Sequence, residues 1–295
     1  MTSFIIQLTE ENFTDLVGLK VSDNTIFTVL FTILIFISGY LLNKLNEHRK
    51  EKVRLDDLKN YFYLLIELII KPINDQINLL NELADDISDL EKTQYKFKEN
   101  VNLDITNLKE ISNNDLYKIF LIRKKGTMQE KTNHFTNITN TLNYIERLKL
   151  NSRLNYEGFN EEYNKNRINW ANACNSILRQ YDSFRSFNLR NNIELSADPF
   201  LKDFDLIIFY WNKRENSKEL QTTYEYFINK LRDMCKKYEP DERANIILQL
   251  VLGADSSFHN IKVAKEIFSK GFKGDAIQLK SKLAGLEAAI VFFQR

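Results

Sequence analysis

The chain has 295 residues, with 41 Lys and Arg against 40 Asp and Glu, so its formal charge at pH 7 is +1. Such a balance provides no overall field toward nucleic acid, which makes nucleic-acid binding a minor hypothesis. Only 8 Gly and 3 Pro occur, and because both residues punctuate sheets and loops, their scarcity argues against a strand-rich fold. The composition therefore predicts an all-α protein.

An uncharged run of 18 residues lies near the N-terminus, from Thr25 to Leu42, and reads TIFTVLFTILIFISGYLL. As a helix it would span roughly 27 Å, close to the hydrocarbon core of a bilayer. A buried core helix seldom lacks a polar face over about five turns, and a cleaved signal peptide would carry a basic n-region that is missing here. We therefore expect a transmembrane helix at 25–42, after a short extracytoplasmic tail at 1–24.

The flanks of this run predict its orientation. The preceding tail contains four carboxylates against one lysine, whereas basic residues follow the run closely: Lys44, Arg49, Lys50, Lys52 and Arg54. By the positive-inside rule, residues 43–295 form a cytosolic domain, and the chain is a single-pass protein of a bacterial-type inner (plasma) membrane. The same basic residues are candidates for contact with membrane lipid head groups, although Glu47 and Glu51 dilute the patch.

Small residues form a stripe inside the apolar run. Thr25, Thr28, Thr32 and Gly39 fall within one narrow arc of a helix. Such a stripe lets two membrane helices approach closely, which would make the chain a homo-oligomer. Alternatively, the threonine hydroxyls bond the carbonyls one turn earlier and mark no interface.

After the run, apolar residues at steps of three and four from Phe62 to Ile87 predict a long amphipathic helix. Pro72 should kink it or begin a new helix. Charged residues do not flank the stripe regularly, so a helical bundle is favoured over a dimeric coiled coil. Glu67 lies inside this apolar stretch, either as a buried switch or partner contact, or on a solvated back face.

Further helices are expected along the rest of the chain. Residues 205–211, DLIIFYW, are assigned to a helix despite their β propensity, because their large side chains recur at helical steps. A division of the cytosolic domain is considered near 155–158, where Asn155 and Gly158 suggest a break. The expected helices cover residues 91–111, 116–124, 131–150, 161–187, 199–214, 217–238, 241–252, 257–270 and 275–293.

No motif for catalysis, cofactor binding or metal binding occurs in the sequence. The three histidines, His48, His134 and His259, are isolated, and there is no HExxH or CxxC pattern. The segment GFKGD at 271–275 lacks the lysine and hydroxyl residue of a phosphate-binding loop. Ser256 and Ser257 beside His259 are too close in sequence to form a triad. We therefore assign no catalytic, cofactor or metal residue.

Function is then inferred by elimination. The leading hypothesis is a non-enzymatic scaffold, sensor or regulatory subunit that is anchored in the membrane and binds a protein partner through its cytosolic helices. An alternative is an oligomerising membrane effector of a bacterial defence or toxin-type system. The third is an enzyme with an unfamiliar helical active site.

Overall fold

The computed structural model describes residues 23–294, and all regular elements in this range are helices, which confirms the all-α prediction. The expected tail at 1–24 lies almost wholly outside the described residues. The elements are α3 (Asp23–Ser88), α4 (Thr106–Glu110), α5 (Asn113–Tyr117), the π-helical turn η1 (Lys118–Ile122), α6 (Met128–Arg190), the 3-10 turn η2 (Leu195–Ala197), α7 (Pro199–Asn212), α8 (Leu220–Thr223), the π-helical turn η3 (Tyr224–Ile228), α9 (Asn229–Lys237) and α10 (Glu242–Gln294).

These elements form two compact units. The first contains the described part of α3 up to Leu64 together with Ser112–Arg123. The second contains Leu65–Ile111 and the chain from Lys124 onward. Helix α3 thus contributes to both units, and each unit is described by itself below.

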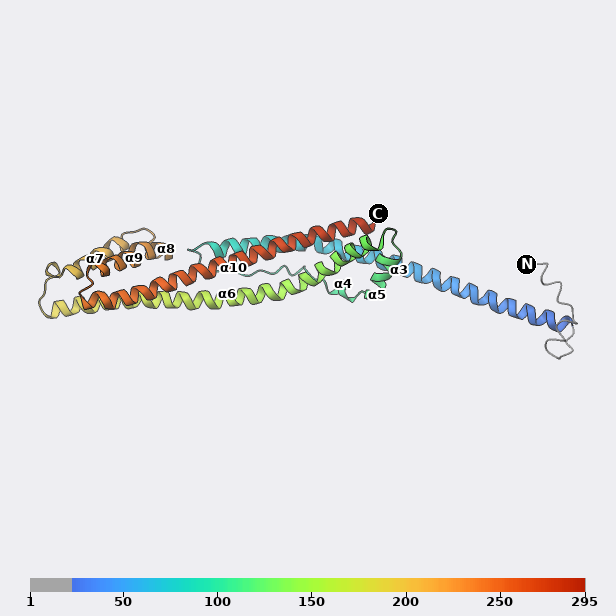
Figure 1. Cartoon of the computed structure of the whole chain (residues 1–295), viewed down its shortest axis with the longest axis horizontal. Coiled ribbons are helices and arrows are strands. Elements are labelled where there is room, and N and C mark those ends of the chain that lie inside the picture. The colour runs from blue at the N-terminus through green and yellow to red at the C-terminus, as the bar shows by residue number, and fades with distance from the viewer. Residues whose placement is uncertain (1–22, 295) are drawn as a thin grey trace. The chain divides into compact units, whose positions relative to one another are not determined.

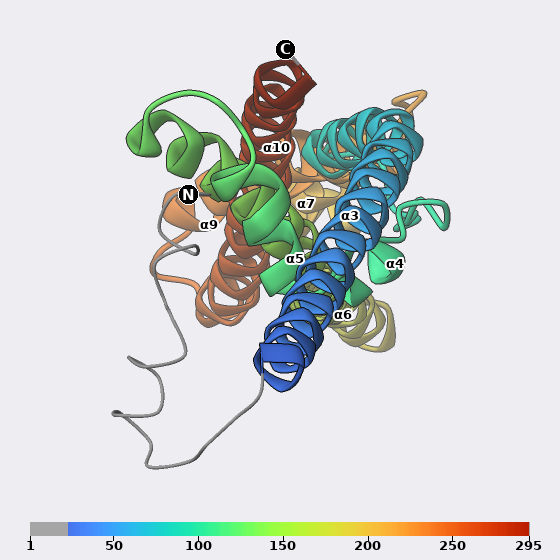
Figure 2. The same ribbon diagram turned by 90° about the vertical axis from the view of Figure 1, so that its right-hand side faces the viewer.

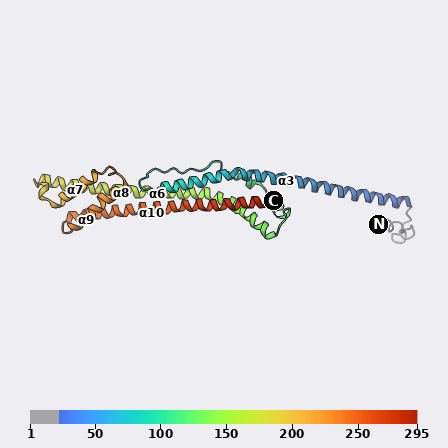
Figure 3. The ribbon, with the colours of Figure 1, turned by 90° about the horizontal axis from the view of Figure 1, so that it is seen from above.

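The second unit is built on two long helices, α6 and α10, which run side by side (Figures 1 and 3). Figure 2 looks along them, so that both axes point toward the viewer. Buried residues of α10 recur at alternating steps of four and three, which keeps one stripe of the helix against its neighbour. That stripe includes Ile247, Val251, Ala254, Phe258, Ile261, Lys265, Phe272, Ala276, Leu279, Leu283, Leu286, Ile290 and Phe293.

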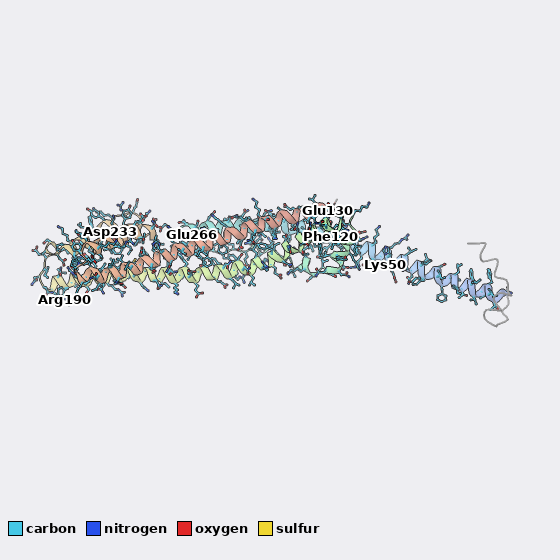
Figure 4. The ribbon with its side chains drawn as sticks, in the orientation of Figure 1. Lys50, Phe120, Glu130, Arg190, Asp233 and Glu266 are labelled. Carbon is cyan, nitrogen blue, oxygen red and sulfur yellow. The ribbon has the colours of Figure 1, made fainter. Side chains whose placement is uncertain are left out.

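Helix α6 begins with a capping box. The side chain of Thr127 accepts a hydrogen bond from the Glu130 backbone N–H, and the Glu130 carboxylate accepts one from the Thr127 backbone N–H. These bonds satisfy donors that the first turn of a helix leaves unpaired. Figure 4 labels Glu130 and Arg190 near the two ends of α6.

Several expected helix breaks are wrong. Helix α6 continues through Asn155–Gly158, and α10 continues through Gly253, Gly271 and Gly274, so Asp275 is an interior residue of α10 rather than the first residue of a new helix. A glycine inside a helix costs only about 1 kcal/mol relative to alanine. The continuous apolar stripe of α10 outweighs that cost. Similarly, α3 does not restart at Pro72 but runs on to Ser88.

The helix expected at 91–111 is also wrong. Residues 91–105 are non-helical, and only Thr106–Glu110 forms a short helix. The side chains of Tyr95 and Phe97 pack on aromatic residues of α6 in an extended conformation: the Tyr95 ring lies 5.0 Å from Phe159, and the Phe97 ring stacks at 5.3 Å on Tyr156. Packing against a distant helix thus overrides the local helical pattern.

Other expectations are confirmed. Residues 199–212 are helical, which includes all of DLIIFYW, and 220–237 form a continuous helical run of α8, η3 and α9. Glu67 is exposed, as expected for a solvated back face, while Phe62, Ile66 and Ile69 on the opposite face are buried. The apolar pattern therefore predicted correctly which face of α3 is buried.

A buried lysine joins the three long helices of the second unit. Lys265 lies in the apolar stripe of α10 and is 1% exposed. Its Nζ donates to the carbonyl oxygens of Asp89, Leu90 (3.2 Å) and Lys92 (3.0 Å), directly after α3 ends at Ser88. These carbonyls lie beyond the last residue of α3, so the ammonium supplies hydrogen bonds to backbone groups that no helix pairs.

The rings of Tyr95 and Tyr163 complete the surroundings of this ammonium, each with its centroid 5.3 Å from the Nζ. Burial lowers the pKa of Lys265 to about 8, while the carboxylates of Asp89 and Glu91 act in the opposite direction. The side chain therefore remains charged at neutral pH. With all three N–H donors engaged, it has a structural role.

Replacing Lys265 by Met should lower the free energy of unfolding by about 2–4 kcal/mol, because the carbonyls of Asp89 and Leu90 would lose the donor that they share. Urea unfolding followed by circular dichroism measures this. Lys270→Met on the same helix is the control, because its side chain is 74% exposed and pairs only with Glu266. It should change stability by less than about 0.5 kcal/mol. Equal effects of the two substitutions would contradict the assignment.

Candidate membrane-anchoring segment

The apolar run at the start of α3 is uncovered in the structure. The mean hydropathy over a window of 18 residues in this helix is 2.3, and none of the residues in the window is buried. Phe27 and Phe36 are 72% and 76% exposed, and Figure 4 shows side chains standing out on all sides of the helix. Soluble proteins rarely expose a contiguous apolar surface of this extent to water. One helix of the described chain is thus long and apolar enough to cross a membrane.

The small-residue stripe has the local hydrogen bonding expected of threonines in a helix. Thr28 donates from its hydroxyl to the Asn24 carbonyl, and Thr32 donates to the Thr28 carbonyl, both at 2.7 Å. No atom outside the helix lies within 4 Å of a Cβ placed on Gly39. The interface between copies, which Thr25 would share, stays a prediction.

Four of the five flanking cations are free of ion pairs within the described residues. Lys44, Arg49, Lys50 and Lys52 are exposed, and the Lys44 ammonium lies 5.9 Å from the ring centroid of Tyr40. At about 100° per residue these four side chains spread around the helix rather than along one face. Figure 4 labels Lys50 on this exposed stretch. The arrangement is a basic collar directly after the apolar run.

The fifth cation, Arg54, has a different role. Its guanidinium bonds Glu51 at 2.8 Å and Asp115 at 2.7 Å, and Lys118 reaches Glu51 at 3.1 Å. Hydrogen bonds from Arg54 and Lys118 lower the pKa of Glu51 to about 2, so this carboxylate stays ionised. Arg54 therefore joins Ser112–Arg123 to α3 within the first unit. Its side chain is 49% exposed, and its contact with lipid stays a prediction.

An aromatic contact holds the same two segments together. Phe120, in η1, is 1% exposed, and its ring lies 5.1 Å from that of Phe62 and 6.1 Å from that of Tyr63. A third ion pair joins Arg123 to Asp56 at 3.1 Å. Exposed ion pairs contribute little by themselves, so buried side chains of this segment such as Phe120 contribute more to its stability than the ion pairs do.

The remaining candidates for chemistry do not assemble into a site. No group of three or more His, Cys, Asp or Glu side chains that could hold a metal gathers within the described residues. Ser257 donates to the Gly253 carbonyl of its own helix at 2.9 Å, and His259 lies 3.8 Å from Asp255. Asp255 in turn accepts from the Tyr224 hydroxyl at 2.6 Å. These bonds connect α10 to η3 and leave no nucleophile beside a base.

Two structural residues were missed by the sequence reasoning. Lys265 could have been found from its register, since it continues the buried stripe of α10 after Ile261. Asp198 caps α7 by accepting from the Leu201 N–H at 3.2 Å and pairs with Arg243 at 2.6 Å. An aspartate before proline does signal a helix N-terminus, but its arginine partner, far along the chain, has no local signature.

Comparison with known proteins adds no identification: no protein family, curated protein or solved structure matches the chain. The class defined here is an all-α protein with one uncovered apolar helix near its N-terminus.

Replacing Phe120 by Ala should loosen Ser112–Arg123 from α3, because the buried ring packs directly on Phe62 and Tyr63 of that helix. Truncating a buried phenylalanine costs about 3–5 kcal/mol. Limited trypsin digestion of the detergent-solubilised chain should then cleave after Lys118 several times faster. Tyr117→Ala is the matched control, because Tyr117 is 45% exposed. Equal cleavage rates in the two variants would contradict the prediction.

Proposed function

We propose that this chain is a single-pass membrane protein whose helical domain works in the cytosol as a scaffold, sensor or regulatory subunit that binds a protein partner. The observation that carries the proposal is the run Thr25–Leu42, uncharged and wholly uncovered. Its eighteen residues match the thickness of a bilayer core, where its exposure carries no hydrophobic penalty.

The basic collar supports the orientation. Lys44, Arg49, Lys50 and Lys52 follow the apolar run at once and are unpaired within the described residues. Cations in this position are retained on the cytosolic side, and each can contribute about 1 kcal/mol of attraction to anionic head groups. Arg54 forms ion pairs with Glu51 and Asp115. The basic collar therefore consists of the other four residues.

The character of the helical domain supports an interaction role. Its buried charged groups are engaged within the protein: Lys265 bonds backbone carbonyls, and Asp198 caps α7 and pairs with Arg243. Helical surfaces without an assembled set of reactive groups commonly act through binding. The proposal of a protein partner rests on this reasoning.

Deleting residues 1–43 should convert a membrane-bound chain into a soluble, strongly helical one. The deletion removes the apolar run and leaves the stripes that stabilise α6 and α10. Carbonate washing of membranes and circular dichroism of the truncated chain measure the two parts. Retention of the truncated chain in washed membranes would contradict the proposal that this run is the anchor.

The domain after Lys44 should be protected from protease added outside spheroplasts. The collar predicts a cytosolic location for it. A tag placed at the C-terminus should survive on intact spheroplasts and disappear after lysis, with a periplasmic protein as the control for protease activity. Loss of the tag before lysis would reverse the topology.

A further inference from the structure

We propose that the extended segment Lys92–Asn100 is a docking edge for an acidic, extended peptide of a partner protein, which binds by adding a β-strand. The inference deepens the proposed interaction role and rests on it. Residues 92–100 of this mostly helical unit form neither helix nor turn.

The segment is held in its extended form at several points. Tyr95 and Phe97 pack on α6, as described above, and Tyr156 donates from its hydroxyl to the Tyr95 carbonyl at 2.8 Å. At the far end, the Asn100 N–H bonds the Gln76 side chain at 2.8 Å. Because these contacts come from rigid helices, a partner would not have to order the segment when it binds.

The backbone between these fixed points is unpaired. Within the described residues, no hydrogen bond engages the N–H groups of residues 93–99. A row of free N–H and C=O groups on an extended chain is a template for another strand. Unpaired peptide groups form hydrogen bonds to water or to a partner. A strand that replaces the water keeps these hydrogen bonds, so its binding costs little free energy in lost hydrogen bonding.

The free edge can be identified by alternation. In a strand, the N–H and C=O of one residue point to the same edge, and those of the next residue to the opposite edge. The Tyr95 carbonyl points to α6, where it meets Tyr156. The backbone groups of Gln94, Lys96 and Lys98 therefore point to the other edge.

A groove of about 450 Å³ lies along this edge. It is lined by residues 92–94, Lys96 and Lys98 on one side, and by Leu79, Glu82, Leu83 and Asp86 of α3 on the other. Tyr95 and Phe97 do not line it, which agrees with their packing on α6. The groove thus offers apolar contact from the partly exposed Leu79 beside a row of free backbone donors, while Leu83 is buried beneath it.

The charges in the groove indicate the chemistry of the peptide. Lys92 and Asp86 pair with each other, which leaves the ammonium groups of Lys96 and Lys98 against the single carboxylate of Glu82. Both lysines are exposed and have no ion pair within the described residues. A peptide that alternates carboxylate and aliphatic side chains places its carboxylates opposite the lysines and an aliphatic group on Leu79.

The test uses the full chain in detergent micelles and a fluorescein-labelled octapeptide of alternating Val and Glu. Fluorescence polarisation should show saturable binding, and an octapeptide of alternating Val and Lys should not bind. Hydrogen exchange followed by mass spectrometry should show fast exchange of the amides of 94–98 in the free chain and protection in the complex.

Three variants separate backbone pairing from charge. Lys96→Ala removes the charge and keeps the N–H, whereas Lys96→Pro removes both. Because no native hydrogen bond uses that N–H, the proline should leave the helical fold unchanged by circular dichroism. It should bind the Val and Glu peptide at least about tenfold more weakly than the alanine variant does. Glu99→Pro controls for proline itself, since Glu99 does not line the groove and its N–H points to the edge facing α6, and it should bind like the parent.

Equal affinities of Lys96→Pro and Lys96→Ala would overturn strand addition, as would binding without protection of the 94–98 amides or no binding of the acidic probe. Carbonate washing of membranes that contain the same variants separates this result from the proposed function. Lost peptide binding with retained anchorage overturns only the docking edge, and lost anchorage of the parent chain overturns the membrane assignment.

Discussion

The second unit depends on one buried ammonium group. Lys265 occupies a core position of α10, where an apolar residue would fit the repeat, and it uses its three donors on the carbonyls that follow α3. A charge in such a position is costly unless every donor is engaged. The same cost makes the contact specific, because any slip of α10 by a turn would leave the ammonium and the end of α3 unpaired at once.

This contact also explains the extended segment. The ammonium gathers the carbonyls at 89, 90 and 92, so the chain leaves helical geometry there, and the rings of Tyr95 and Tyr163 cover the charge. Tyr95 and Phe97 then pack along α6, which keeps the following residues extended. The contacts of Lys265 thus connect three features: the end of α3, the cation–π contacts with Tyr95 and Tyr163, and the unpaired backbone of the extended segment.

The first unit contains two kinds of basic residue, those without an ion pair and one that is paired. Four cations after the apolar run are unpaired and spread around the helix, while Arg54 is bound by Glu51 and Asp115. From their positions in the sequence, all five basic residues were predicted to flank the membrane segment in the same way. The fifth, Arg54, joins α3 to Ser112–Arg123 through Asp115, and hydrogen bonds from Arg54 and Lys118 lower the pKa of Glu51 to about 2.

From the sequence by itself came the all-α class, the uncharged run at 25–42, the basic flank and the solvated face bearing Glu67. These are properties of neighbouring residues, set by hydrophobic period and local charge. Only the tertiary structure decided that α10 runs unbroken through its glycines, that α3 ends at Ser88, that 92–100 is extended and that Arg54 is bound. Each of these depends on groups far apart in the chain, such as Lys265 with the end of α3 or Tyr156 with Tyr95, and their meeting has no signature in local sequence.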